Sequence, residues 1–256
     1  MTSTAAHVDA PAPSTVPSAE SIAATAEAYA HTHRDVSGGW LRPAVFGAMD
    51  GLVTNVSLIA GVGGAGRGPH FIVLTGLAGL AAGAFSMATG EYVSVSSQNE
   101  LVGAEVRKER VELERNPAGE QRELAESFMR SGVDPDLAHQ VAVQVSAHPD
   151  SALRVHVREE LGVDYQDLPS PAAAGAVSLL TFAIGALIPL LPYLAGFASL
   201  PAALILAAAA AVAGGGLVSQ ITARPFLHGA LRQLILGGLA AGLTFVIGTA
   251  VGHIVG

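Results

Sequence analysis

The chain has 256 residues, of which 50% are hydrophobic and only 13% are charged, and its mean hydropathy is +0.47. Soluble domains carry about 25% charged residues, so this composition excludes an ordinary soluble enzyme. The net charge of −8 argues against nucleic acid as a partner, because phosphate binding needs basic patches. Cysteine is absent, which excludes disulfides and thiolate metal sites.

The charged residues are concentrated in one segment of the chain. Residues 98–168 hold 15 acidic and 8 basic side chains, whereas residues 43–97 and 169–256 together hold five charged side chains. This distribution predicts an all-α, polytopic membrane protein with a water-facing helical domain inserted into it. We expect a disordered tail at 1–40, transmembrane helices 1 and 2 within 41–97, an acidic helical domain at 98–168 and transmembrane helices 3 to 5 within 169–256.

Five segments are long and apolar enough to cross a bilayer core, which requires about 20 residues per helix. Three Gly-x-x-x-Gly motifs, beginning at Gly47, Gly79 and Gly248, would allow close helix packing, although such spacings also arise by chance in a chain so rich in glycine and alanine. The five segments are Ala44–Ala65, Phe71–Ala88 with its continuation past Tyr92, Ala172–Leu191, Leu200–Ile221 and Leu234–Val255.

The arginine and lysine residues near the helix ends predict the orientation in the membrane. With the N-terminus in the cytoplasm, twelve basic residues lie on the inner side, and only Arg67 lies on the outer side. The acidic domain is therefore expected in the cytoplasm and the C-terminus outside. The composition, without a recognisable organelle signal, favours a bacterial plasma membrane.

The acidic segment has the composition of a series of helices. No helix breaker separates Tyr92 from Gln98, so the second membrane helix is expected to continue out of the membrane to Arg115. We expect a turn at 116–119, a helix from Glu120 to Arg130, a helix from Pro135 to Ser146 capped by Asp134, and a last helix from Pro149 that ends at Gly162.

Two carboxylates lie at membrane depth, where ionisable groups are costly and are functional candidates. Asp50 begins a polar stripe with Thr54 and Ser57 on the first span, and Glu91 follows Met87 by one helical turn on the second. A thioether beside carboxylates suits a borderline metal such as Fe²⁺ better than Mg²⁺ or Ca²⁺. An interfacial Glu91 that reaches water, and a Met87 that fills the core, are the alternatives.

The inserted segment stacks acidic residues on helix faces, an arrangement that destabilises a helix unless a cation is bound. His156 lies four residues before Glu160 and adds a possible nitrogen ligand. A solvated acidic face interleaved with arginine and lysine explains the spacing equally well. The candidate metal ligands are Glu105, Glu109, Glu112, Glu120, Glu123, His156, Glu159 and Glu160.

Four motifs resemble the vacuolar iron transporter family. They are DGLVTN at 50–55, GAFSMATGEYVS at 83–94, ELG at 160–162 and GALIPLLP at 185–192, and the resemblance extends from about residue 40 to the C-terminus. It implies a homodimer of five-helix subunits with a cytoplasmic metal-binding domain. It also implies export of Fe²⁺, often with Mn²⁺ and other divalent ions, from the cytoplasm in exchange for protons.

The resemblance also implies roles for individual residues. The ligands of the membrane pathway fall on Asp50 and Met87, with Glu91 at the cytoplasmic mouth. The glutamates of the metal-binding domain fall on Glu109, Glu112, Glu120, Glu123 and Glu160. Plant members place methionines shortly before the last of these glutamates, whereas this chain has His156 and Val157.

The function expected from the sequence is secondary transport of Fe²⁺, and of Mn²⁺ as a further cargo, without an enzymatic activity or a prosthetic group. The glycine-rich stretch at 63–68 lacks the Lys-Ser/Thr of a P-loop, so no nucleotide-driven pump is indicated. One alternative is a membrane-tethered metal-binding or di-iron oxidase protein, although the Glu-x-x-His pairs of di-iron bundles do not occur in 98–168. A metal-gated channel is another, and it differs from a proton-coupled exporter only kinetically.

Overall fold

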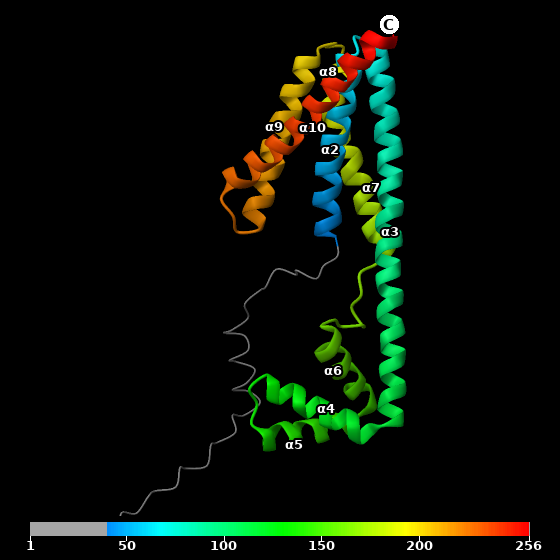
Figure 1. The fold of residues 1–256 in the computed structure, drawn as a ribbon, viewed down its shortest axis with the longest axis vertical. Coiled ribbons are helices and arrows are strands. Elements are labelled where there is room, and N and C mark those ends of the chain that lie inside the picture. Colours follow the sequence, from blue (N-terminus) through cyan, green and yellow to red (C-terminus); the bar gives the residue numbers. More distant parts are fainter. Residues whose placement is uncertain (1–39, 256) are drawn as a thin grey trace, which may run out of the picture. The chain divides into compact units, whose positions relative to one another are not determined.

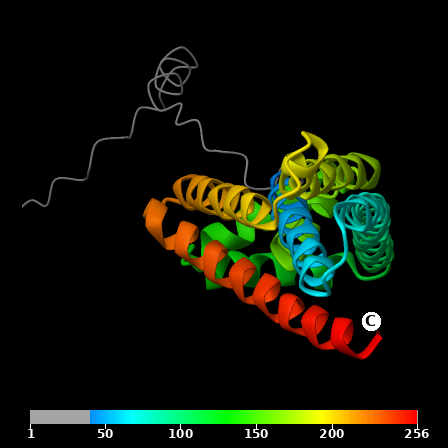
Figure 2. The ribbon, with the colours of Figure 1, turned by 90° about the horizontal axis from the view of Figure 1, so that it is seen from above.

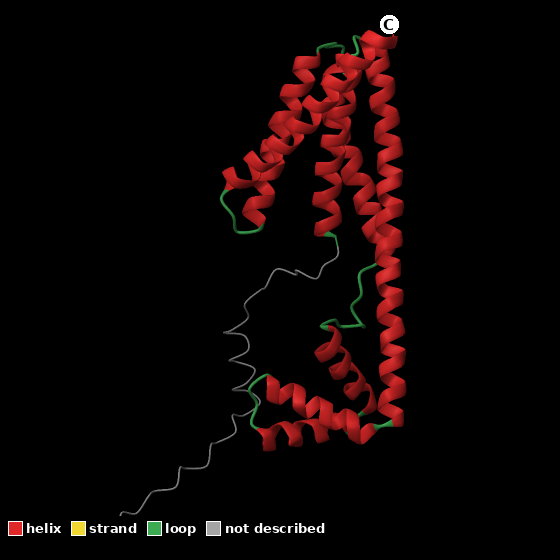
Figure 3. Cartoon of the chain, viewed as in Figure 1, coloured by secondary structure: helices red, strands yellow, loops and turns green. Residues whose placement is uncertain are grey.

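The computed structural model describes residues 40–255, and all regular structure in this range is helical (Figure 3). The tail expected at 1–40 lies outside the described residues except for Trp40. The elements, in chain order, are α2 (Leu41–Gly64), α3 (Pro69–Arg115), α4 (Pro117–Arg130), α5 (Pro135–Ser146), α6 (Pro149–Leu161), α7 (Pro171–Leu187), the 3₁₀ helix η1 (Ile188–Leu190), α8 (Leu191–Leu194), α9 (Leu200–Ile221) and α10 (Phe226–Val255).

Five helical segments of the described chain are long and apolar enough to cross a membrane, which confirms the predicted number. The fifth begins at Phe226 rather than at Leu234. The third runs from Pro171 to Leu194 and changes from α7 through η1 to α8, because Pro189 and Pro192 each lack the N–H that a continuous α-helix needs. The chain is therefore an integral membrane protein.

Helix α3 joins the membrane-spanning part of the fold to the acidic segment (Figure 1). It contains 47 residues without interruption, a length of about 70 Å at 1.5 Å per residue. A bilayer core is only about 30 Å thick, so more than half of α3 extends beyond it. The prediction that the second span continues directly into the insert is confirmed.

Helix α2 packs against four other membrane helices, namely α3, α7, α9 and α10 (Figure 2). Its contact with α7 brings the two backbones together: a Cβ on Gly51 would collide with the carbonyl oxygen of Phe182, and a Cβ on Gly185 with that of Ala48. On α10, a Cβ at Gly248 would collide with the carbonyl oxygen of Gly61. The motifs that begin at Gly47 and Gly248 thus do lie at close helix contacts.

Helices α4, α5 and α6 fold together with the last part of α3. Two small apolar clusters hold them: Val106 of α3 packs with Leu153 and Val157 of α6, and Leu124 of α4 packs with Ala142 of α5. Asp134 caps α5, as predicted, through hydrogen bonds from the N–H groups of Asp136 and Leu137. The last helix, α6, ends at Gly162 as predicted, and this glycine has a φ of 67°, in the left-handed region.

The turn expected at 116–119 is wrong. Helix α4 begins at Pro117, because the Asn116 side chain accepts a hydrogen bond from the N–H of Gly119 and the proline occupies the first helical position. Only Asn116 separates α3 from α4. This tight connection fixes where the first turn of α4, and therefore Glu120, lies against α3.

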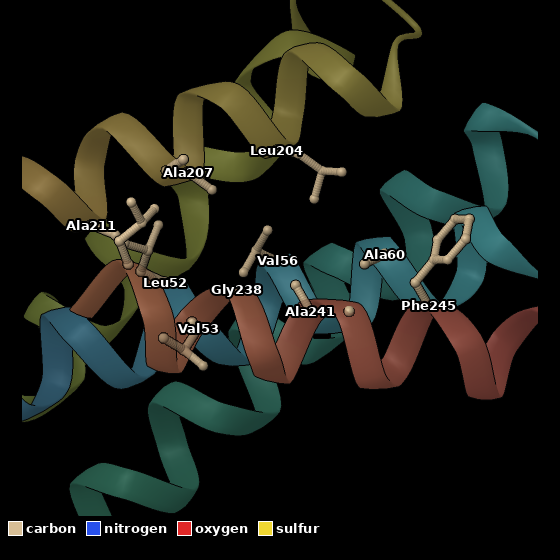
Figure 4. A pocket seen from close by; sticks show the side chains of 14 residues that line it. Leu52, Val53, Val56, Ala60, Leu204, Ala207, Ala211, Gly238, Ala241 and Phe245 are labelled. Carbon is tan, nitrogen blue, oxygen red and sulfur yellow. The ribbon is translucent and has the colours of Figure 1, made fainter. Parts of the chain in front are cut away.

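A cavity of about 400 Å³ lies between α2, α9 and α10 (Figure 4). Aliphatic side chains, glycines and Phe245 line it, among them Leu52, Val56, Leu204 and Ala241. No carboxylate, imidazole or thioether lines this cavity. It therefore offers nothing to a cation, and the candidate site lies elsewhere.

Candidate metal centre

Three helices bring four ionisable side chains together in the acidic segment. Glu109 comes from α3, Glu120 from the first turn of α4, and His156 and Glu160 from α6. One ligand atom from each lies within 4.8 Å of the ligand atoms of the others. The Nδ1 of His156 lies 3.2 Å from Glu109 Oε1, 3.6 Å from Glu160 Oε1 and 3.9 Å from Glu120 Oε2.

Packing and capping place these side chains. Val106 lies one turn before Glu109 and packs against Leu153 and Val157, so the face of α3 that carries Glu109 is turned towards α6. On α6, His156 lies one turn after Leu153 and one turn before Glu160, which puts both ligands at the same face. The apolar contacts therefore set the register of the polar ones.

The centre of the cluster is buried, and two of its polar atoms lack a hydrogen-bond partner. The exposed fraction is 6% for Glu109, 9% for Glu120 and 1% for His156. Neither Oε1 of Glu109 nor Nε2 of His156 has a hydrogen-bond partner, although both are buried. Burying polar groups without partners costs free energy. The arrangement is thus better suited to a bound cation than to the empty protein.

The pKa values of the glutamates reflect this environment. The pKa of Glu109 is raised from 4.5 to about 7, chiefly by burial and then, in decreasing order, by the neighbouring carboxylates of Glu160, Glu120, Glu112 and Glu123. Burial, and then the charge of Glu123, raise the pKa of Glu120, whereas His156 lowers it. A divalent cation would relieve the repulsion that produces these shifts.

The distances fit a single ion. Two ligands that each lie about 2.1 Å from one metal are separated by about 3 to 4 Å, close to the separations between His156 Nδ1 and the three carboxylates. A small pocket of about 30 Å³ lies beside Glu109 and Glu160. Carboxylate oxygens with one imidazole nitrogen are suitable ligands for Fe²⁺, Mn²⁺ or Zn²⁺.

The other candidate ligands of this segment fall into two groups. Glu112 and Glu123 are exposed but close enough to raise the pKa of Glu109, and Glu105 lines the small pocket while pairing with Lys108 at 3.8 Å. Glu159 is not part of the group of close ligand atoms, and one of its carboxylate oxygens accepts a hydrogen bond from Ser127 Oγ at 3.2 Å. Adjacent Glu159 and Glu160 thus have different surroundings.

The three pathway candidates lie on α2 and α3, apart from this cluster. Asp50 and Met87 are half-buried, and Met87 packs against the apolar cluster that contains Phe182. Glu91 forms an ion pair with Arg42, in which Nη1 and Oε1 are 3.2 Å apart. Among residues 40–255, the group of mutually close metal-ligand atoms includes neither Asp50 nor Glu91.

Three residues near the pathway candidates have no role in the site that was expected from the sequence. In the sequence Arg42 contributes only to the charge distribution that predicts topology, and nothing there shows that it pairs with a residue 49 positions away. Asn55 is fully buried, donates a hydrogen bond to the carbonyl of Ala186 and leaves its own Oδ1 without a partner. Ser57 is also buried with an unpartnered hydroxyl. Its place in the stripe that begins at Asp50 was the available signal.

Comparison with known proteins identifies the family. The family model described as the VIT family matches residues 41–249, which include the first four membrane-spanning segments, the helical insert and most of the fifth segment. The chain belongs to the VIT family. The resemblance drawn from the four sequence motifs is thereby confirmed.

Several curated proteins are similar to this VIT family member. The vacuolar iron transporter of Acanthamoeba castellanii is 38% identical over 228 residues, which cover 84% of this chain and 81% of that protein. Vacuolar iron transporter 1 of Oryza sativa subsp. japonica is 31% identical over 239 residues, with coverages of 90% and 94%. Vacuolar iron transporter homolog 3 of Arabidopsis thaliana is 32% identical over 212 residues, with 80% of each chain covered.

Proposed function

We propose that the protein exports Fe²⁺, with Mn²⁺ as a further cargo, from the cytoplasm in exchange for protons. The observation that carries this proposal is the cluster of Glu109, Glu120, His156 and Glu160, built on a helix that is continuous with the second membrane span. Membership of the VIT family, whose similar members are named vacuolar iron transporters, supports iron as the cargo.

The first step is capture of the metal ion by the insert. The distribution of basic residues supports a cytoplasmic position for residues 98–168 and for the N-terminus, with the C-terminus outside. The exposed carboxylates of Glu112 and Glu123 attract cations towards the buried ligands. Coordination by Glu109, Glu120, His156 and Glu160 then replaces part of the hydration shell of the ion.

The second step is passage through the membrane. Glu91 stands at the cytoplasmic mouth, and Asp50 and Met87 supply a carboxylate and a thioether at membrane depth. Thr54 and Ser57 continue the stripe from Asp50 into a groove of about 640 Å³ between α2 and α10. Competition between the metal ion and a proton at the carboxylates couples the two fluxes.

A homodimer in a bacterial plasma membrane completes the proposal. The groove between α2 and α10 is open at the surface of the subunit and is lined by polar side chains, Thr54, Thr244 and Arg67 among them, which a second copy would shield from lipid. The five spans show no internal duplication, which also supports two subunits around one pathway. The plasma membrane is proposed on composition alone.

The test uses the full-length protein in proteoliposomes that contain a fluorescent iron chelator. Wild-type protein is expected to move Fe²⁺ against an opposing proton gradient, and Asp50→Ala to abolish this transport while metal binding by the insert persists. Asp136→Asn, an exposed change on α5, is the matched control. Normal transport by Asp50→Ala refutes the pathway, and transport that ignores the pH gradient favours a channel. Oxygen-dependent oxidation of Fe²⁺ by the purified protein would instead favour the oxidase alternative.

A further inference from the structure

His156 differs from the other groups around the candidate metal centre because it offers nitrogen. The remaining candidate ligands within the cluster, Glu109, Glu120 and Glu160, offer carboxylate oxygens, and so do the nearby Glu112 and Glu123. An all-oxygen set of this charge is the kind that Ca²⁺ and Mg²⁺ prefer. Imidazole binds first-row transition metals such as Fe²⁺, Co²⁺, Ni²⁺ and Zn²⁺ much better than it binds these hard ions.

Packing alone does not account for a histidine at this position. The side chain is 1% exposed, its Nε2 has no hydrogen-bond partner, and its Nδ1 faces three carboxylates at 3.2 to 3.9 Å. An apolar residue of similar size would avoid the cost of burying unpaired nitrogen. A metal ion bound at Nδ1 and at the three carboxylates would neutralise their negative charge, and an apolar residue at position 156 could not contribute to this coordination.

We infer that His156 makes the insert selective for transition-metal ions over Mg²⁺ and Ca²⁺. The three carboxylates provide affinity for any divalent cation, and the single nitrogen provides the discrimination. Fe²⁺ is therefore preferred over Mn²⁺, which accepts oxygen ligands more readily, and Mn²⁺ is preferred over Mg²⁺. This inference rests on the proposed function, and it explains how the protein loads iron from a cytoplasm in which Mg²⁺ is much more abundant.

The first experiment measures Co²⁺ and Mg²⁺ affinities of the full-length protein in detergent, with Co²⁺ as an air-stable substitute for Fe²⁺. We expect His156→Gln to weaken Co²⁺ binding at least about tenfold and to change Mg²⁺ binding by less than about threefold. His139→Gln, an exposed histidine on α5 of the same insert, should leave both affinities unchanged. Equal losses of both ions in His156→Gln would indicate a structural role and overturn the inference, as would an unchanged Co²⁺ affinity.

The second experiment needs no variant that alters the buried cluster. Pulsed electron paramagnetic resonance of Mn²⁺ bound to the wild-type protein is expected to show ¹⁴N modulation from a coordinated imidazole, which His139→Gln retains. Bound Mn²⁺ without this modulation overturns the inference, because the ion is then held by the carboxylates without an imidazole ligand. A wild-type protein that binds neither Mn²⁺ nor Co²⁺ overturns the proposed function itself.

Discussion

Arg42 Nη1 lies 3.2 Å from Glu91 Oε1 and joins the first turn of α2 to α3. The Arg42 side chain is 76% exposed, whereas that of Glu91 is only 10% exposed. A positive charge in the first turn of a helix is disfavoured by the helix dipole, so the contact with Glu91 accounts for the position of Arg42. A metal ion that approaches Glu91 must compete with this guanidinium.

Replacing Arg42 is therefore expected to ease the entry of metal. In Arg42→Gln the Glu91 carboxylate loses its only described cationic partner, so the KM for Fe²⁺ in proteoliposomes should fall several-fold, while Arg42→Lys stays near wild type. Arg224→Gln removes an exposed arginine from the connection between α9 and α10 and serves as control. A higher KM in Arg42→Gln would mean that the ion pair organises the mouth rather than blocks it.

The pKa of Glu109 predicts how metal binding depends on pH. Because this pKa is about 7 in the metal-free protein, Glu109 becomes protonated as the pH falls through 7, and the proton then competes with the metal. One such group lowers the apparent affinity about tenfold between pH 8 and pH 6. Titration calorimetry in buffers of different ionisation enthalpy should detect the released proton. Binding that is constant from pH 6 to pH 8 would contradict this.

The same shift predicts a conflict between stability and binding. The pKa of Glu109 is raised on folding, so its contribution to stability is fully present below pH 4.5 and is lost as the pH rises towards 7. Glu109→Gln should therefore raise the thermal unfolding temperature of the metal-free protein at pH 8 and weaken metal binding. Added metal should stabilise the wild type more than the variant. Destabilisation of the metal-free variant at pH 8 would contradict this prediction, because it would show that other groups of the protein already stabilise the negative charge of Glu109.

The adjacent residues Glu159 and Glu160 allow a sharp test of the site geometry. Glu160 Oε1 lies 3.6 Å from His156 Nδ1, whereas Glu159 accepts a hydrogen bond from Ser127 on α4. Glu160→Gln is expected to weaken Co²⁺ binding at least about tenfold, and Glu159→Gln to leave it unchanged. Each change removes one negative charge from the same end of α6, so general electrostatics would affect both equally. Equal effects would place the ion outside the cluster.

The membrane spans and the continuous α3 could be predicted because they depend on local sequence. Length, apolar composition and the absence of a breaker between Tyr92 and Gln98 are sufficient for these features. The start of α4 could not be predicted in this way, because Asn116 occurs in caps and in turns alike, and the side-chain hydrogen bond to Gly119 decides between them.

The site was only partly predictable for a related reason. Helical spacing placed Glu109 and Glu160 on the right faces, yet a solvated acidic surface explained the same spacing. Only the packing of α3 against α6 shows which of these carboxylates His156 meets. The Arg42–Glu91 pair was even less predictable from the sequence, because it depends on how α2 lies against α3 and leaves no pattern in either helix.

The contact between α2 and α7 yields a last prediction about the membrane fold. A Cβ at Gly51 would collide with the backbone of Phe182, and one at Gly185 with the backbone of Ala48, where no flexible side chain can give way. Gly51→Ala and Gly185→Ala should thus lower the thermal unfolding temperature of the purified protein and reduce its yield, despite the better helix propensity of alanine. Gly238→Ala on α10 is the control, because a Cβ there meets nothing within 4 Å. If all three variants unfold at the same temperature as the wild type, α2 and α7 lie farther apart in the membrane than these backbone contacts require. The position of Asp50 relative to α3 must then be revised.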